Sequence, residues 1–258
     1  MIQLVGKNSN FVNNSKKYFN QENIIIDDQY INNNTKTLAL VGNYSPSNNN
    51  ENTRELYEKN ISRFKNFINQ NLKFKKHLNV VYLSAISVYG DNWNGKTIKA
   101  SPEKKDYYSK SKLTCEKLLI QFCKNRSHNL FILRIPGILQ ENCKRNFICN
   151  LIDKLKNNSR IHIKSPENKF NNLISLEDIC KFIKLINDNK ISTRYRYFNL
   201  ACFQPISIKK IIGILEKKYN KEAKIIQASD QKERLIDLER LRKVGFIAKT
   251  VEKALIDF

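Results

Sequence analysis

The sequence predicts an α/β protein built on a doubly wound parallel sheet, and two observations support this. Short runs of β-branched and other apolar residues alternate with segments in which apolar residues recur at every third or fourth position. Such alternation is typical of parallel strands joined by crossover helices that cover both faces of the sheet. A chain of 258 residues can also bury a substantial core without disulfides or metal ions.

The elements of this sheet are expected mainly in the first half of the chain. Strands are predicted over residues 2–5, 23–26, 37–41, 80–84 and 130–134. Apolar spacing indicates two helices, one containing Leu56, Ile61, Phe64, Phe67 and Ile68, and the other containing Leu118, Leu119 and Phe122. The Asn-rich segments 31–34 and 45–52 are predicted to be loops.

The chain changes character after Pro136, where the apolar runs become shorter and a turn-rich stretch covers residues 164–172. Helical stripes are indicated at 147–155, 179–186 and 208–219, and their apolar residues are expected to lie in the core. The sequence therefore predicts a first domain over residues 1–140 and a smaller C-terminal lobe over 141–258 that partly returns to it.

The chain is strongly basic, with 46 Lys and Arg against 24 Asp and Glu and a formal net charge of +22. Clustered basic residues would indicate a nucleic-acid partner, because they release counterions when they neutralise phosphates. The lysines are instead spread over nearly every predicted helix. This favours a solvated basic surface over nucleic-acid binding, and it is compatible with a mild attraction for anionic nucleotides.

The six cysteines include no C-x-x-C pair, and the three histidines are far apart in sequence, so no metal site is expected. The N-terminus lacks the features of a secretion signal, and no stretch approaches the roughly eighteen apolar residues that indicate a membrane span. These observations predict a soluble cytoplasmic protein with reduced thiols and no membrane partner.

Tyr108 and Lys112 form the pattern that points to chemistry. They are four residues apart on a predicted helix, so they share one face and lie one turn from each other. The phenol of a tyrosine has a pKa of about 10. An adjacent ammonium stabilises the phenolate and lowers this pKa. Such a tyrosine can exchange a proton with a sugar hydroxyl or carbonyl while a nicotinamide exchanges hydride.

The surrounding segments make this short spacing specific. They read V-V-Y-L-S-x-x-S-V-Y-G over 80–90, Y-x-x-S-K-x-x-x-E over 108–116 and L-R-I-P-G-I over 133–138. Together they resemble the extended short-chain dehydrogenase/reductases, the nucleotide-sugar epimerase and dehydratase family. The resemblance covers almost the whole chain and continues through residues 173–179, 197–200, 236–238 and 245–246. It implies a Rossmann-like domain that binds a dinucleotide and a C-terminal lobe that binds substrate.

The resemblance also implies roles for individual residues. Tyr108 becomes the general acid/base, and Lys112 lowers its pKa and holds the nicotinamide ribose. The family has a third catalytic residue, a Ser or Thr, at the position of Ala85. Ser84 precedes Ala85 and is expected to point to the opposite face of a strand, whereas Ser87 has the parity of Ala85 and is slightly favoured as its substitute. Dehydratase-like relatives carry a Glu at the position of Ser87, and its absence argues against dehydration.

The loop after the first strand, which binds the dinucleotide in the family, departs further from the family pattern. That pattern has G-x-x-G-x-x-G in this loop. Only Gly6 is retained, and Asn10 and Asn13 stand where the second and third glycines belong when Phe11 and Val12 are aligned. Asparagine tolerates positive φ, so the turn can survive, but its Cβ would crowd a pyrophosphate. Gly6, Asn10, Phe11 and Val12 are the expected cofactor contacts of this loop.

Further cofactor contacts are expected beyond this loop. Asp27 or Asp28 follows the second strand, where a carboxylate accepts hydrogen bonds from the adenosine ribose and favours NAD over NADP. An ordinary turn acid is the alternative interpretation. Pro136 aligns with the turn beside the nicotinamide. The segment 27–37 is much shorter than the usual family connection, so the sheet is expected to be shortened by at least one strand and helix.

Two functions follow from the resemblance. The first is an NAD-dependent epimerase or reductase that acts on a nucleotide-activated sugar, with a homodimer as the family assembly. Epimerisation and reduction use the same Tyr, Lys and nicotinamide and stay unresolved at this stage. The second is a catalytically impaired descendant that serves as a binding or regulatory module, which the loss of the glycines and of the Ser at Ala85 would explain.

Overall fold

A parallel sheet forms the centre of the protein. The structure is a computed structural model, and it describes residues 1–6, 9–19, 24–41, 53–72, 77–90, 100, 106–124, 126–143, 146–191, 196–228 and 232–258. Within these residues six parallel strands lie in the order β10-β5-β4-β3-β1-β2. Their bounds are Ile2–Val5 (β1), Ile24–Ile26 (β2), Thr37–Val41 (β3), Asn79–Ala85 (β4), Asn129–Ile135 (β5) and Tyr197–Asn199 (β10). The parallel sheet is therefore confirmed.

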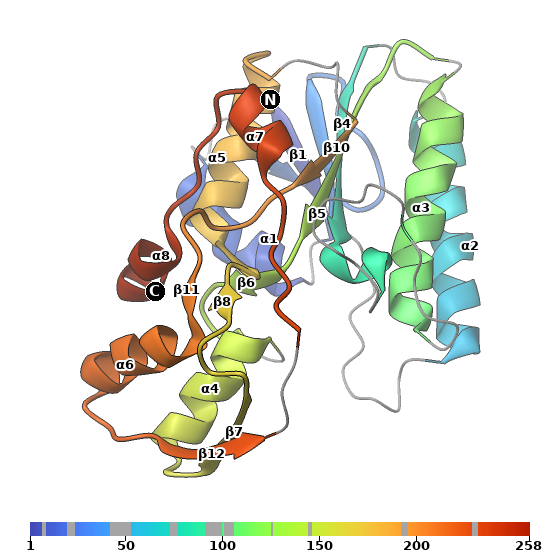
Figure 1. The fold of residues 1–258 in the computed structure, drawn as a ribbon. Coiled ribbons are helices and arrows are strands. Elements are labelled where there is room, and N and C mark those ends of the chain that lie inside the picture. Colours follow the sequence, from blue (N-terminus) through green and yellow to red (C-terminus); the bar gives the residue numbers. More distant parts are fainter. Residues whose placement is uncertain are drawn as a thin grey trace.

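Helices cover both faces of this sheet. On one face α2 (Arg54–Asn71) lies beside α3 (Tyr107–Lys124), and on the other lie α1 (Asn10–Ser15) and α5 (Leu176–Asn187), as Figure 1 shows. Neighbouring strand residues face opposite layers. In β4, Val81 belongs to the apolar cluster that includes α5, and Tyr82 to the cluster that includes α2 and α3. The doubly wound arrangement is therefore confirmed.

The sheet is shortened on the side of β2, as expected. In the standard strand order 3-2-1-4-5-6 a further strand lies outside the second one, whereas β2 is the edge strand here and residues 27–36 contain no helix or strand. Gln3, fully buried in β1, holds this short connection. Its amide donates to the carbonyl oxygen of Tyr30 at 2.5 Å and accepts from the Asn32 N–H at 2.9 Å and the Thr35 hydroxyl at 2.8 Å.

The second half of the chain builds a smaller group of elements. Two-stranded sheets pair β6 (Gly137–Leu139) with β9 (Leu173–Ser175), β7 (Arg160–Lys164) with β12 (Lys224–Ala228), and β8 (Lys169–Phe170) with β11 (Ile206–Ser207). The helices are α4 (Phe147–Lys156), α6 (Ile208–Tyr219), α7 (Glu239–Lys243) and α8 (Val251–Asp257). Figure 1 shows α4, α6, β7 and β12 grouped at one end of the molecule.

Several predicted elements agree with the structure and others lie outside it. The helical stripes of 147–155, 179–186 and 208–219 form α4, α5 and α6. Asn23 and the predicted loop 45–52 lie outside the described residues. Among the described residues, no helix is long and apolar enough to cross a membrane, and no group of three His, Cys, Asp or Glu side chains could hold a metal ion.

Candidate active site

The start of α3 places the predicted pair of residues. Asp106 precedes the helix, and its carboxylate accepts a hydrogen bond from the Ser109 N–H at 3.0 Å, which satisfies one of the free amides of the first turn. Tyr108 and Lys112 follow on one face, with the Lys112 Nζ 5.8 Å from the centre of the Tyr108 ring. Lys112 is buried, and its Nζ donates to the carbonyl oxygen of Leu83 in β4 at 2.8 Å.

The electrostatics of this pair differ from the expectation. Burial, followed by the negative charge of Asp106, raises the pKa of Tyr108 to about 12. Burial lowers the pKa of Lys112 to about 8. The predicted lowering of the Tyr108 pKa by Lys112 is not seen here, because the loss of hydration and the charge of Asp106 both raise that pKa. At neutral pH Tyr108 is a protonated phenol, which is a proton donor.

Tyr108 lines a cavity of about 650 Å³. Its other walls come from the carboxyl ends of β4 and β5, where Ala85, Ser87 and Pro136 lie, and from the second half of the chain. The latter supplies Asn146, Phe147, Phe170, Asn172 and Arg234. This volume is in the range of small-molecule binding sites. The cavity thus brings together Tyr108, Ser87 and Pro136 of the predicted site. Ala85, which stands at the position of the family Ser, lines it as well.

The two candidate serines have different surroundings. β4 ends at Ala85, and residues Ile86–Tyr89 form a 3-10 helix, so the strand parity used to favour Ser87 does not extend to it. Ser87 nevertheless lines the cavity, because the 3-10 turn brings it there. Ser84 is buried away from the cavity, and its hydroxyl donates to Glu116 at 2.5 Å. Of the two serines, Ser87 is the one that lines this cavity.

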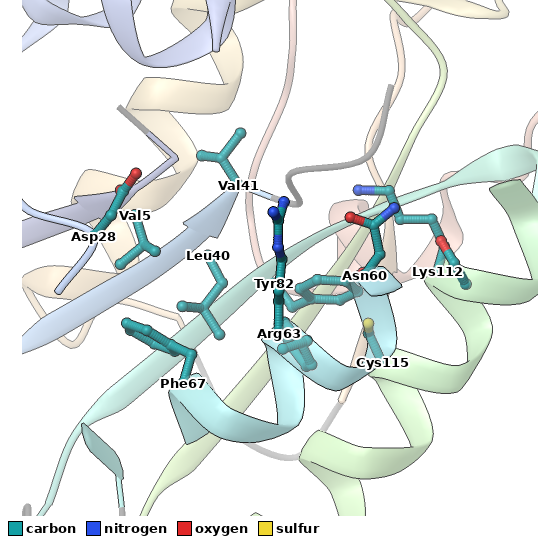
Figure 2. A pocket seen from close by; sticks show the side chains of 12 residues that line it. Val5, Asp28, Leu40, Val41, Asn60, Arg63, Phe67, Tyr82, Lys112 and Cys115 are labelled. Atoms are coloured by element: carbon teal, nitrogen blue, oxygen red, sulfur yellow. The ribbon is translucent and has the colours of Figure 1, made fainter. Parts of the chain in front are cut away.

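A second cavity of about 190 Å³ lies at the carboxyl ends of β1 and β3, against α2 and α3. Chain connections leave β1 and β3 in opposite directions along the sheet, and ligands of doubly wound proteins bind at such a switch point. Figure 2 shows Asp28 at one end, Lys112 at the other, and Arg63 and Asn60 between them. The buried Asn60 Nδ2 has no hydrogen-bond partner in the described part of the chain.

The loop after β1 is only partly described, because residues 7–8 lie outside the described ranges. Gly6 has a φ of 122°, a left-handed value that favours glycine. Asn10 is exposed at the start of α1, while Phe11 and Val12 are 4% and 0% exposed in the apolar core. None of these four expected cofactor contacts lines either of the two cavities.

The structure separates the two candidate acids that follow β2. The Asp27 carboxylate accepts from the N–H groups of Gln29 at 2.7 Å and Tyr30 at 3.3 Å, which is the arrangement of a turn-stabilising acid. Asp28 lines the smaller cavity, and its carboxylate accepts from the Gly6 N–H at 2.5 Å. Of the two acids, Asp28 is therefore the one that lines the smaller cavity.

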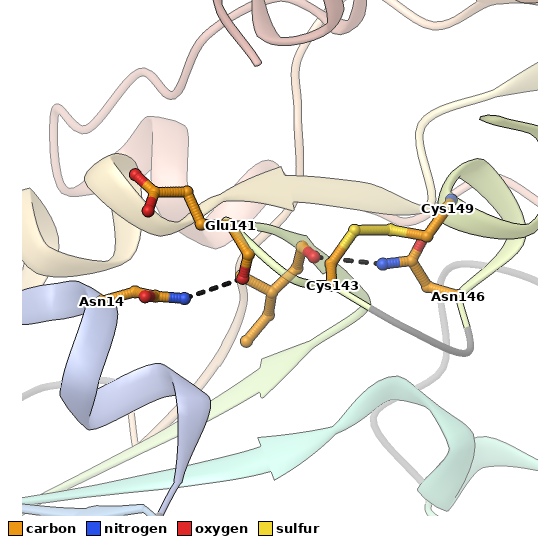
Figure 3. The surroundings of a disulfide bond; sticks show 6 residues. Asn14, Glu141, Cys143, Asn146 and Cys149 are labelled. Carbon is orange, nitrogen blue, oxygen red and sulfur yellow. Dashed lines mark hydrogen bonds between the residues drawn. A yellow bond between two sulfur atoms is a disulfide. The ribbon is translucent and has the colours of Figure 1, made fainter. Parts of the chain in front are cut away.

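A disulfide lies beside the larger cavity and corrects the expectation of reduced thiols. Cys143 and Cys149 are bonded, with their Cα atoms 6.2 Å apart (Figure 3). Asn146 begins α4 between them, and its side chain accepts from the Cys149 N–H at 2.9 Å. The turn before α4 and the first turn of the helix bring the two sulfurs together. No sequence motif predicted this contact. The free cysteines, all buried, are Cys115, Cys123, Cys180 and Cys202.

Arg234 and Asn172 are site residues that the sequence did not single out. Both line the cavity beside Tyr108, although each is more than sixty positions from it in the chain. Arg234 stands three residues before Asp237, in a segment that carried part of the family resemblance. Its place next to that segment was the one signal that could have identified it.

No family model and no curated protein matches the sequence, but solved structures match the fold. The dTDP-4-dehydrorhamnose reductase of Bacillus anthracis, in complex with NADP, has a TM-score of 0.72 and 16% identity, covering 100% of this chain and 97% of its own. The chain shares the fold of this enzyme. UDP-glucose 4-epimerase of Thermotoga maritima with UDP-glucose has a TM-score of 0.72 and 12% identity, covering 98% and 96%. UDP-N-acetylglucosamine 4-epimerase of Bacillus cereus has a TM-score of 0.73 and 13% identity, covering 99% and 94%.

These matches bear out, at the level of the fold, the resemblance drawn from the motifs. Reductases and epimerases of nucleotide sugars share this arrangement of a parallel sheet and a smaller C-terminal group of elements with the present chain. The expected Rossmann-like fold is therefore confirmed.

Proposed function

We propose that the protein is a nicotinamide-dependent reductase or epimerase of a nucleotide-activated sugar. One observation carries this proposal: adjacent Tyr108 and Lys112 open onto different cavities, Tyr108 onto the larger and Lys112 onto the smaller. A cofactor that is held in the smaller cavity beside Lys112 and reaches the larger one would approach the proton donor Tyr108. We assign the dinucleotide to the domain of residues 1–140 and the outer wall of the substrate cavity to residues 141–258.

The side chains around the smaller cavity fit a dinucleotide. The Asn60 Nδ2, which has no partner among the described residues, and the buried ammonium of Lys112 are donors suited to ribose and phosphate oxygens. The Asp28 carboxylate suits the adenosine ribose and favours NAD, whereas the guanidinium of Arg63 in the same cavity would suit the 2′-phosphate of NADP. When bound, the nicotinamide supplies hydride transfer.

The remaining chemistry belongs to the chain. In reduction, the phenol of Tyr108 donates its proton to the oxygen of the sugar ketone, and Lys112 stabilises the phenolate that is left. Ser87, which lines the same cavity, donates a hydrogen bond to the same oxygen. Arg234 suits the diphosphate of a nucleotide sugar, because its planar guanidinium can bind two oxygens at once. Epimerisation would use the same groups, but Tyr108 would first have to lose its own proton before it could accept the proton of the sugar hydroxyl.

Calorimetry with NAD, NADH, NADP and NADPH, followed by turnover of a panel of UDP-, GDP- and dTDP-sugars, tests the proposal. We expect binding of at least one dinucleotide in the micromolar range and turnover of at least one keto or hydroxyl sugar. Preference for NAD would agree with Asp28, and preference for NADP would assign the 2′-phosphate to Arg63. A protein that binds none of the four dinucleotides would contradict the proposal.

A binding module without turnover is the second candidate, and two observations favour it. Ala85 replaces the family hydroxyl, and the Gly6 N–H, a group that could meet a phosphate, already donates to Asp28. This candidate predicts tight binding of a nucleotide sugar without hydride transfer. Detection of any dinucleotide-dependent turnover would reject it.

The pKa of Lys112 leads to a pH prediction. Burial lowers it to about 8, so the positive charge is present below pH 8 and is lost as the pH rises through that value. The kcat/KM for the dinucleotide reports the enzyme before binding and should fall above about pH 8, by up to about tenfold per pH unit. Lys112→Arg keeps its charge and should remove this step, whatever its absolute rate. A wild-type profile that stays flat from pH 6 to 10 would show that the Lys112 charge has no role.

A further inference from the structure

A pair of serine hydroxyls stands at the edge of the substrate cavity. Ser109 is 0% exposed in the first turn of α3, and its hydroxyl donates to the hydroxyl oxygen of Ser87 at 2.6 Å. The backbone of Ser109 is itself fixed, because its N–H donates to the Asp106 carboxylate at 3.0 Å. Ser87 is exposed to the cavity that Tyr108 lines. The pair thus joins the helix that carries Tyr108 to the turn that follows β4.

The direction of this hydrogen bond determines what Ser87 can do. A serine hydroxyl has one proton to donate and lone pairs that accept. Because Ser87 accepts from Ser109, its own proton is available for a partner in the cavity. A hydroxyl that accepts a hydrogen bond is also a stronger donor, since bonds in a chain polarise one another.

The neighbouring position explains why such a pair would be needed. Ala85 is the last residue of β4 and lines the same cavity with a methyl group, which cannot donate a hydrogen bond. Ser87 lies on a 3-10 turn rather than on the strand, so the sheet does not hold its side chain. Ser109 supplies that restraint from α3.

We propose that Ser109 is a positioning residue that directs the Ser87 hydroxyl toward the reacting oxygen of the sugar. Ser87 and Ser109 together then provide the hydrogen bond that the side chain at Ala85 cannot. This inference rests on the proposed function, because it assigns a role within the same reaction.

A double-mutant cycle on purified full-length protein tests this role. We expect Ser87→Ala to lower kcat about 10²-fold, as the loss of one donor to the reacting oxygen does. Ser109→Ala should lower kcat about five- to tenfold with little change in KM, because the interaction strengthens in the transition state. The double variant should equal Ser87→Ala, since Ser109 acts only through Ser87. Additive losses, or wild-type kcat in Ser109→Ala, would overturn the proposal.

Two further measurements separate this role from a purely structural one. Ser15→Ala is the matched control, because Ser15 is a buried serine in α1 whose hydroxyl donates within its own helix at 2.9 Å, and its kcat should stay at the wild-type value. The hydroxyl proton of Ser109, followed by NMR with serine labelled at Cβ, should exchange slowly in the wild type and faster in Ser87→Ala. Equal exchange rates would overturn the inference whatever the activity. A protein that keeps the slow proton but converts no nucleotide sugar would overturn the proposed function, and any catalytic role of the pair with it.

Discussion

Tyr108→Phe is expected to lower kcat by about 10²- to 10⁴-fold, the range for removing a general acid. Only the phenolic oxygen is lost, so the aromatic ring stays beside Lys112 and the walls of the cavity are kept. Because burial raises the Tyr108 pKa to about 12, the proton that this oxygen carries is present throughout the neutral range. Steady-state kinetics with the dinucleotide and sugar found by the binding panel would measure the loss.

The neighbouring Tyr107 provides a matched control. It lies on the same turn of α3, but its ring packs against Tyr57, with the ring centres 6.2 Å apart, and it does not line the cavity. Tyr107→Phe should therefore keep kcat within about twofold of the wild type. If Tyr108→Phe also keeps kcat within that limit, Tyr108 is not the general acid of the reaction.

The periodicity of apolar residues predicted the strands and helices whose positions depend on nearby residues in the sequence. The long apolar strands and the helices with clear spacing were placed correctly, because burial on a sheet or helix face imposes a period on the residues. The strand β10 has only three residues, Tyr197–Asn199, and was recognised only as part of a family motif. The paired short strands of the second half, such as β8 and β11, are likewise fixed by contacts between distant segments.

The same distinction applies to the candidate site. Tyr108 and Lys112 are four residues apart on one helix, so their proximity could be predicted from spacing. The choice of Asp28 over Asp27 depends on how the chain turns after β2, and neighbouring residues at a strand end cannot be separated by pattern alone. Arg234 reaches the cavity through the fold of the second half, which sequence spacing does not encode.

The burial of charged side chains also could not be predicted from the spacing of residues in the sequence. Tyr–Lys proximity predicts a lowered phenol pKa, but the structure buries the Lys112 ammonium in α3 and lowers its own pKa to about 8. The depth at which a side chain is buried depends on the packing of α2 and α3 on the sheet, not on the four-residue interval. The same packing encloses the one buried ion pair formed within the described residues, between Glu116 and Arg134.

Glu116→Gln is expected to reduce the free energy of unfolding by about 3–5 kcal/mol, the usual cost of leaving a buried charge without its partner. Glu116 and Arg134 have side chains 0% and 2% exposed, and the carboxylate accepts from the Arg134 Nη2 at 2.7 Å and Nε at 3.0 Å. Ser84 donates to the same carboxylate. With a neutral amide in its place, the guanidinium would stay charged inside the protein, because arginine does not lose its proton at accessible pH.

Urea unfolding followed by circular dichroism would measure this loss, with Glu252→Gln as the matched control. Glu252 pairs with Lys210 at 2.7 Å on the surface, and removing an exposed pair costs at most about 1 kcal/mol. The double variant Glu116→Leu with Arg134→Met should recover most of the stability lost by Glu116→Gln, because neither charge then remains buried. An equal, small loss in Glu116→Gln and Glu252→Gln would mean that water reaches Arg134. Since Glu116 lies one turn after Lys112 and ties α3 to β5, such water would also weaken the placement of Tyr108.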